Sequence, residues 1–203
     1  MRNRVVCLVI AGLLISMFAA GCQSAQTAPP GGSAAGQTGR ALSLAVDATD
    51  GSLFKAAGGL FRSIDRGQTW QPLPIPTSLH PETLRTVATT SAAPSSVYAA
   101  GPGAGILRSD DRGQTWRTVS AGLPSQDVSA FTVHSFRPDT LYAWIDGQGV
   151  FRTEDAGGRW QKMDAGPAGT IVALAHSTLE GSMNTGWLYA ATPEGPYLSM
   201  DCF

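Results

Sequence analysis

The octapeptide SIDRGQTW occupies residues 63–70, and it returns almost unchanged as SDDRGQTW at residues 109–116. A more divergent copy, TEDAGGRW, occupies residues 153–160, and a partial copy begins with SMD at residue 199. Successive copies are 46, 44 and 46 residues apart, as counted between the aspartates Asp65, Asp111, Asp155 and Asp201. A fixed period of this length is the sequence signature of a repeat architecture, because each repeat is a supersecondary unit completed by its neighbours.

The sequence around each octapeptide repeats as well. A glycine, two apolar residues and an arginine come directly before each complete copy, at residues 59–62, 105–108 and 149–152. Two further apolar stretches lie upstream of each of these, and one short stretch follows each octapeptide tryptophan. Four short strands per repeat, separated by turns rich in Gly, Pro, Asp and Ser, are typical of a β-propeller blade. A β-sandwich is the alternative, but a sandwich does not need a fixed period.

The octapeptide resembles the Asp box, or BNR repeat, which has Ser or Thr first, Asp third, Gly fifth and Trp eighth. Sialidases, some xyloglucan hydrolases, sortilin-type receptors and photosystem II assembly factor-like propellers share this motif, so it specifies a fold better than a function. The resemblance implies that each copy forms the turn between the third and fourth strands of a blade. We predict an all-β propeller of four-stranded blades, partial or truncated at about 3.5–4 blades, with a closed four-bladed ring as the alternative. The expected blades are residues 41–80, 84–126, 127–170 and, incomplete, 171–203.

The residue types of the octapeptide indicate a structural role. Its carboxylate can accept hydrogen bonds from the backbone of its own turn, its glycine can take a positive φ, and its tryptophan can pack between sheets. Equivalent turns on different blades would hold the carboxylates well apart, so we assign them neither catalysis nor metal binding. The residues given this role are Ser63, Asp65, Gly67, Trp70, Ser109, Asp111, Gly113, Trp116, Thr153, Asp155, Gly157, Trp160, Ser199 and Asp201.

The N-terminal residues have the pattern of an export signal. Arg2 and Arg4 precede an apolar run at residues 5–18, and small residues follow before Cys22. The ending resembles a bacterial lipobox, although Ala19 stands where Leu is usual. We predict a lipoprotein signal peptide at residues 1–21 and a lipid on Cys22 that anchors the protein to a membrane in the cell envelope. Ordinary cleaved export and an uncleaved anchor are the alternatives. Residues 22–40 contain no Val, Ile, Leu or aromatic residue, which predicts a flexible tether.

Charge and composition exclude several functions. The 14 basic residues against 15 acidic residues leave a net charge of −1 and no basic stripe, so we predict no nucleic-acid partner. Three scattered cysteines form no metal-binding pair, and His80, His134 and His176 are far apart in unrelated sequence contexts. We interpret these histidines as surface or strand residues, and we expect neither a metal nor a cofactor.

Propeller ligands usually bind at the end of the blades opposite the octapeptide turns, which is an argument by analogy with the fold. The acidic residues predicted at that end are Asp127, Asp146, Asp164 and Glu194. Each is also compatible with an ordinary solvated turn. Nothing in these segments forms a close acid–base pair, a Ser/His/Asp set or a phosphate-binding loop.

These observations favour an exported, membrane-tethered propeller that binds an envelope protein or a glycan without catalysis. The alternative is a glycoside hydrolase, of the exo-sialidase or xyloglucanase type, or an inactive fragment of one. Sialidases carry three arginines on the sugar carboxylate, but Arg62, Arg108 and Arg152 precede the octapeptides and therefore lie at the wrong end. An incomplete last blade would expose an edge and an apolar face, which also suggests self-association.

Overall fold

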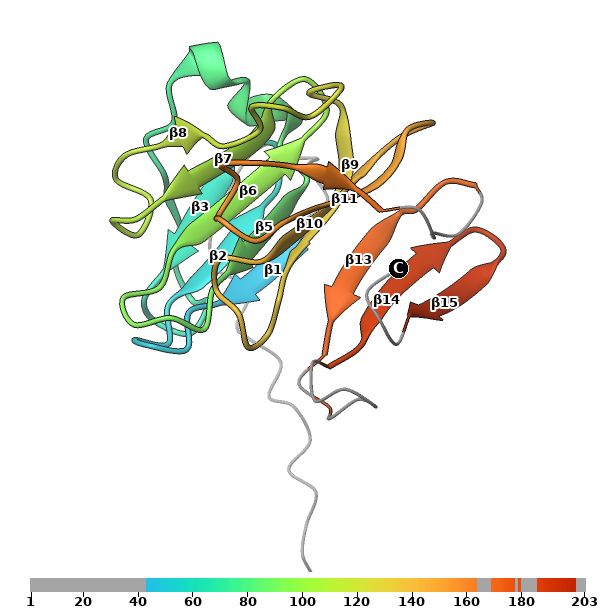
Figure 1. Ribbon diagram of the computed structural model, residues 1–203. Helices are drawn as coiled ribbons and strands as arrows, with labels where there is room; N and C mark the ends of the chain where they lie inside the picture. Colours follow the sequence, from blue (N-terminus) through green and yellow to red (C-terminus); the bar gives the residue numbers. More distant parts are fainter. Residues whose placement is uncertain (1–42, 164–168, 178, 180–185, 200–203) are drawn as a thin grey trace, which may run out of the picture. The chain divides into compact units, whose positions relative to one another are not determined.

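The computed structural model describes residues 43–163, 169–177, 179 and 186–199, and within these it contains four antiparallel sheets in chain order (Figure 1). Each strand pairs with the next along the chain, so we call the sheets blades 1 to 4. Blade 1 contains β1 (Ser43–Val46), β2 (Leu53–Ala56), β3 (Leu60–Ser63) and β4 (Gln71–Pro72). Blade 2 contains β5 (Thr86–Thr89), β6 (Val97–Gly101), β7 (Gly105–Ser109) and β8 (Arg117–Thr118).

Blade 3 contains β9 (Val128–Val133), β10 (Leu141–Ile145), β11 (Gly149–Thr153) and β12 (Gln161–Lys162), and blade 4 contains β13 (Ala173–His176), β14 (Leu188–Thr192) and β15 (Gly195–Ser199). Two short 3₁₀ helices, η1 (Thr77–Leu79) and η2 (Pro81–Thr83), lie in the connection from blade 1 to blade 2. The predicted all-β propeller is confirmed, and the octapeptides occupy the turns between the third and fourth strands of blades 1 to 3.

The hydrophobic core lies between blades. Side chains alternate across each strand, so one face of a blade packs on the preceding blade and the other face packs on the following blade. Phe54, Tyr98 and Tyr142 occupy the same position in the second strand of successive blades, and each is at least 99% buried against the next blade. The aromatic residue at this position is therefore an interblade packing residue in blades 1 to 3.

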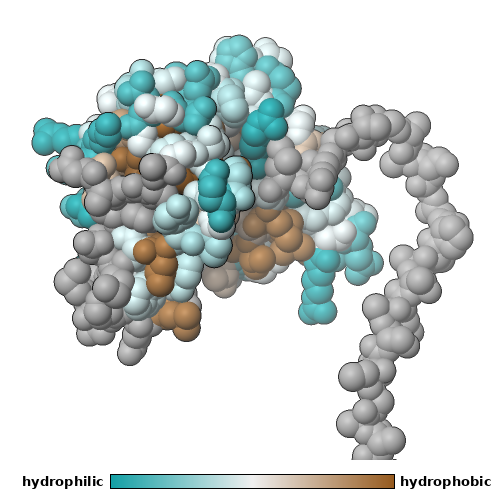
Figure 2. Space-filling view, turned by 90° about the vertical axis from the view of Figure 1, so that its right-hand side faces the viewer, coloured by the Kyte–Doolittle hydropathy of each residue, from teal (hydrophilic) through white to brown (hydrophobic). Residues whose placement is uncertain are grey.

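The first strand of each blade is its innermost strand, and contacts between these strands join β1 to β5, β5 to β9 and β9 to β13. The described residues of β1 and β13 share no comparable set of contacts. Val87 on β5 is 3% exposed, but Leu44 and Val46 on β1 are 61% and 55% exposed. Leu198 on β15 is also exposed, and Figure 2 shows apolar areas on the side of the molecule that carries β13–β15 in Figure 1. Apolar side chains on the outer faces of blades 1 and 4 are thus exposed among the described residues, whereas Val87, which corresponds to Leu44, is buried between blades.

Several predicted features lie outside the described residues. These are the signal peptide at residues 1–21, the tether at residues 22–40 with Cys22, and the acidic residues Asp164 and Asp201. Within the described part of the chain, no helix has the length and apolar character needed to span a bilayer.

Candidate functional site

Each octapeptide turn forms a closed set of hydrogen bonds around its aspartate. In the β7–β8 turn, Asp111 Oδ1 accepts hydrogen bonds from Ser109 Oγ at 2.7 Å and from the Thr115 backbone N–H at 2.8 Å. Thr115 Oγ1 donates to Asp111 Oδ2 at 2.5 Å. The hydroxyl and backbone N–H of Thr115, together with Ser109 Oγ, hold the pKa of Asp111 at about 2. The carboxylate is consequently ionised and engaged within its own turn.

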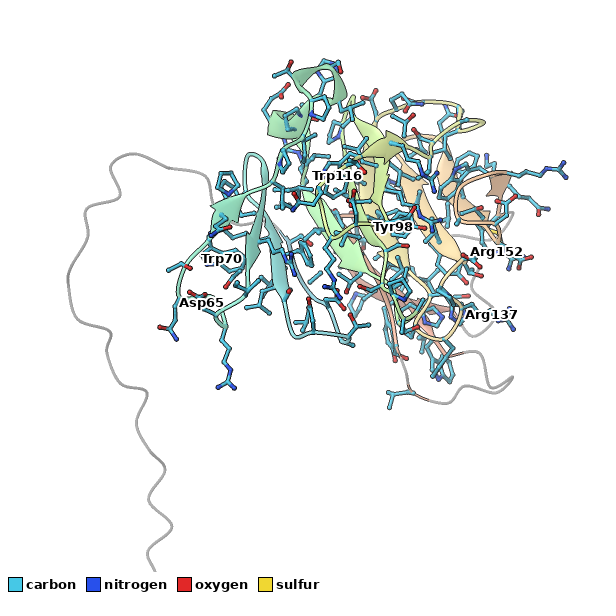
Figure 3. All side chains as sticks on the ribbon, turned by 90° about the vertical axis from the view of Figure 1, so that its left-hand side faces the viewer. Asp65, Trp70, Tyr98, Trp116, Arg137 and Arg152 are labelled. Atoms are coloured by element: carbon cyan, nitrogen blue, oxygen red, sulfur yellow. The ribbon has the colours of Figure 1, made fainter. Side chains whose placement is uncertain are left out.

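The β3–β4 turn repeats this arrangement, with Thr69 donating twice to Asp65, whose pKa is also about 2 (Figure 3). In the β11–β12 turn, Arg159 replaces the threonine and only its backbone N–H donates to Asp155, at 2.8 Å. The hydrogen bond from Thr153 Oγ1 and this backbone bond still lower the pKa of Asp155. The three carboxylates therefore act locally, each within a separate blade.

The octapeptide turns also contact the preceding blade. A Cβ on Gly157 would lie 2.5 Å from Val119 O, and Trp160 Nε1 donates to the same carbonyl at 2.9 Å. A Cβ on Gly113 would lie 2.7 Å from a methyl carbon of Leu73. Both glycines have positive φ angles, of 95° and 92°. Glycine is therefore required here both for the turn conformation and for the close approach of two blades.

Arg62 and Arg108, which precede the first two octapeptides, contact aromatic rings and carboxylates of their own blades. The Arg108 guanidinium lies 5.5 Å from the centre of the Tyr98 ring, and its Nε donates to Asp110 at 2.7 Å. Arg62 lies over Phe54 in the same way, at 5.7 Å. Burial raises the pKa of Tyr98 to about 12, so this phenol stays protonated. In blades 1 and 2 the arginine before the octapeptide thus pairs with an aromatic ring of its own blade.

A cavity of about 220 Å³ lies where the innermost strands meet. Every blade contributes to its wall, through β1, β5, β9 and β13 or the residues directly before them. The contributing residues are Ser43, Arg85, Thr86, Ser129, Phe131, Val172, Ala173 and Leu174. Most of these residues lie at the start of an innermost strand, and each innermost strand ends at the turn on the octapeptide side. The cavity therefore opens towards the end of the blades opposite the octapeptide turns.

The chemistry of this cavity is cationic and hydroxylic on an apolar background. Arg85 is exposed, and no carboxylate belongs to the described residues that line the wall. Ser43, Thr86 and Ser129 supply hydroxyl groups, while the other wall residues are apolar. A guanidinium beside apolar walls can bind a carboxylate through two parallel hydrogen bonds. The cavity therefore fits a small anionic group and provides few groups for proton transfer.

The acidic residues predicted at this end do not line the cavity. Asp127 precedes β9 and accepts a hydrogen bond from Ser125 Oγ at 3.2 Å. Asp146 and Glu194 are exposed in the β10–β11 and β14–β15 turns, and Asp164 lies outside the described residues. The sequence analysis did not identify Arg85, although its position directly before β5 places it at the end of the blade opposite the octapeptide turn.

The expectation that the histidines are far apart in unrelated contexts is wrong for His134 and His176, whereas the interpretation as a strand residue is correct for His176, at the end of β13. The rings of His134 and His176 stack with their centres 3.9 Å apart across the boundary between blades 3 and 4. His134 is only 2% exposed. The two residues are about one repeat apart in the chain, and this spacing was the signal that could have revealed their contact. Among the described residues, no cluster of His, Cys, Asp or Glu has the arrangement of a metal site.

The chain matches no protein-family model and no curated protein sequence. Its fold is similar to several solved structures. The GH74 xyloglucanase from Xanthomonas campestris is 21% identical with a TM-score of 0.63, over 82% of this chain and 30% of that one. YCF48 from Cyanidioschyzon merolae is 16% identical with a TM-score of 0.56, over 80% of this chain and 54% of that one.

A further structure, of YCF48 bound to a D1 peptide, is 19% identical with a TM-score of 0.59, over 81% of this chain and 52% of that one. The present chain thus spans less than a third of the xyloglucanase and about half of YCF48. At these identities the likeness establishes the β-propeller fold.

Proposed function

We propose that this protein is an exported, membrane-tethered propeller that binds a partner bearing a carboxylate, on a protein or a glycan, and that it performs no catalysis. The cavity at the convergence of the innermost strands is the binding site, and Arg85 is its anion-binding residue. The observation that carries this proposal is the position of an exposed guanidinium among hydroxyl and apolar wall residues, without a carboxylate in the described wall.

The geometry supports a binding role better than a hydrolytic one. Glycoside hydrolysis normally requires two carboxyl groups on either side of the bond that is cleaved. The octapeptide carboxylates are engaged in their own turns, at the other end of the blades. The likeness to a YCF48 structure with a bound peptide agrees with a polypeptide partner. Turnover of a sialoside or a xyloglucan oligosaccharide by the purified chain would contradict the proposal.

Photocrosslinking tests the location of the site. A photoreactive amino acid replaces Ser129 in the cavity wall, and in a matched variant it replaces Gln114 in an octapeptide turn at the opposite end. In the native envelope, we expect one defined adduct from position 129 and none from position 114. Arg85→Ala should remove the adduct, and Arg85→Lys should retain part of it. Adducts from position 114 alone would place the site elsewhere.

Metabolic labelling with radioactive palmitate tests the tether. Cys22→Ser should abolish labelling and release the protein into the soluble fraction, because the acyl chains provide the membrane affinity. The chain offers its own controls, since Cys7→Ser and Cys202→Ser should leave labelling unchanged. Equal labelling of all three variants would exclude Cys22 as the lipid attachment site.

A further inference from the structure

The residue that follows each innermost strand occupies one structural position in all four blades. The backbone N–H groups of Asp47, Thr90, His134 and Ser177 donate, respectively, to the carbonyl oxygens of Ser52, Ser96, Thr140 and Trp187. These bonds close the turn between the first and second strands. The side chain at this position can therefore be compared from blade to blade.

In blade 1 this position carries a buried carboxylate. Asp47 Oδ1 accepts a hydrogen bond from the Thr49 backbone N–H at 2.8 Å, and Ser95 Oγ of blade 2 donates to Asp47 Oδ2 at 2.5 Å. In blade 3 the imidazole of His134 is the hydrogen-bond acceptor at this position. His134 Nδ1 accepts from the backbone N–H groups of Phe136, at 3.1 Å, and Arg137, at 3.2 Å.

A second imidazole, from blade 4, completes the contact. His176 is the last residue of β13, and its ring stacks on His134 at 3.9 Å. Its Nδ1 accepts from the Ser135 backbone N–H at 3.2 Å, while Ser135 Oγ donates to the His176 carbonyl oxygen at 2.8 Å. The Tyr142 ring is nearly parallel to that of His176, with the centres 6.0 Å apart. The boundary between blades 3 and 4 is therefore an aromatic stack tied to the backbone.

This arrangement requires both imidazoles to be neutral. Each Nδ1 accepts a backbone N–H, so its lone pair must be free and the ring proton must be on Nε2. Protonation would point a new Nδ1–H at backbone N–H donors and would place two positive charges 3.9 Å apart. His176 Nε2 is buried and has no hydrogen-bond partner among the described residues, so no described acceptor would stabilise the charge.

The neighbouring charged groups also oppose protonation. Arg137, in the β9–β10 turn, and Arg152, on β11, are labelled in Figure 3. The positive charges of both arginines disfavour protonation of His134. Arg152 is paired with Glu154 at 3.2 Å, and the centre of the Tyr142 ring on β10 lies 6.4 Å from that of His134. Burial, followed by the charges of His176 and the arginines, lowers the pKa of His134 to about 4. Burial likewise lowers the pKa of His176.

We propose that the His134–His176 stack is an acid-sensitive latch that holds blade 4 against blade 3. The latch is next to the cavity, because His176 lies two residues after Leu174 on β13. Val172, Ala173 and Leu174 form the blade 4 part of the cavity wall, so release of blade 4 opens that wall. Regulation of binding by the latch rests on the proposed function, whereas the latch itself does not.

The lowered pKa values of the two histidines set the pH range in which the contact between blades 3 and 4 weakens. A histidine whose folded-state pKa is lower than its unfolded-state pKa stabilises the contact fully above the unfolded value, near 6.5. The contact weakens as the pH falls from 6.5 towards about 4, because the opened state binds protons that the closed state excludes. Blade 4 should therefore detach in mild acid, while blades 1 and 2 stay folded.

Hydrogen exchange on the purified full-length chain tests this proposal without any ligand. Protection factors, corrected for the intrinsic effect of pH, are measured between pH 7.5 and 4.5. We expect protection of β13 and β14 to fall on the order of ten-fold by pH 5, with β5 and β6 unchanged. His134→Asn, which keeps an acceptor oxygen but does not titrate, should flatten this dependence. His80→Asn, at an exposed histidine, should leave it unchanged.

Nitrogen-15 NMR of the imidazoles in the unsubstituted chain covers the case in which a variant fails to fold. We expect both His134 and His176 to carry their proton on Nε2 and their pKa values to lie below the usual histidine value of 6.5. An Nδ1–H form, a His134 pKa at or above 6.5, or equal loss of protection in all blades would overturn the latch. Arg85→Ala distinguishes the binding site from the latch, because it should abolish ligand binding and leave the pH dependence of hydrogen-exchange protection unchanged.

Discussion

The boundary between blades 1 and 2 and the boundary between blades 3 and 4 can be compared at one backbone position, the residue that follows the first strand of a blade. The two boundaries have different side chains at this position. At the first boundary, the carboxylate of Asp47 joins a turn of blade 1 to Ser95 of blade 2. At the last boundary, the imidazole of His134 closes the corresponding turn and stacks on His176 of blade 4. The octapeptide turns also differ between the two halves. The hydroxyl groups of Thr69 and Thr115 donate to the aspartates of blades 1 and 2, whereas Arg159 in blade 3 has no hydroxyl group to donate.

The difference shows that blades 1 to 3 each have a side-chain acceptor at this position, but that the chemical group that accepts differs between blades. A carboxylate keeps its lone pairs at all pH values above its low pKa, whereas an imidazole loses the Nδ1 lone pair on protonation. Burial raises the pKa of Asp47, but hydrogen bonds from Ser95 and Thr49 outweigh burial and leave the pKa below its usual value. The first half of the array should thus tolerate acid that opens the second half.

Removal of the carboxylate at the first boundary should have the largest effect. Asp47 is fully buried, so Asp47→Ala would leave the Thr49 backbone N–H and the Ser95 hydroxyl without an acceptor. We expect a loss of about 1–3 kcal/mol in the free energy of unfolding, measured by urea denaturation. Asp47→Asn should lose less. A cost for Asp47→Ala no greater than that of Asp146→Ala, in an exposed turn, would contradict the role assigned to this carboxylate.

Exchange of the acceptor at the last boundary is expected to rank second. His134→Asp places a carboxylate where blade 1 has one, and a carboxylate keeps its acceptor lone pairs as the pH falls through 6.5. Protection of β13 and β14 should then persist between pH 6.5 and 4 and should fall only in stronger acid. The measurement is hydrogen exchange over a pH series. An unchanged response would mean that the acid sensitivity lies outside the stack.

A backbone substitution in the third octapeptide turn should have a smaller effect. Ala156 has a φ of 58°, a left-handed conformation that glycine adopts without steric cost. Ala156→Gly should raise the free energy of unfolding by about 0.5–1 kcal/mol. Ala175→Gly in β13 is the matched control and should lower it, because that residue is in an extended strand. Destabilisation by both substitutions would show that this turn is not strained.

Restoration of the missing hydroxyl should produce the smallest change. Arg159→Thr supplies the group that Thr115 provides in blade 2, so the pKa of Asp155 should fall towards that of Asp111, which is about 2. The reverse substitution, Thr115→Val, should raise the pKa of Asp111. Carboxyl carbon shifts in an NMR titration report both values. If neither pKa moves, the threonine hydroxyl is not what separates these turns.

Much of the fold could be predicted from the sequence because the determinants of a blade are local and repeated. A glycine, two apolar residues and an arginine predict β7 at residues 105–108, and the structure has this strand at Gly105–Ser109. The donors to Asp111 all lie within four residues of it in the chain. Local hydrogen bonds and a regular period therefore suffice for strand positions and turn chemistry.

The candidate site was harder to predict, because it depends on residues from separate repeats. Asp127, Asp146 and Glu194 are acidic residues predicted at the end of the blades opposite the octapeptide turns, yet none of them lines the cavity at that end. Arg85 lines it because four innermost strands converge beside that residue. Convergence of this kind is set by interblade packing, about which a single repeat contains little information.

The sequence by itself determined the all-β propeller, the order of strands and the end of each blade at which the octapeptides lie. The reason is that strand alternation, turn residues and period are properties of neighbouring positions. Only the tertiary structure decided that Arg85 lines a shared cavity and that His134 meets His176. Those contacts join residues about one repeat apart or more, and the twist between packed blades decides which side chains meet.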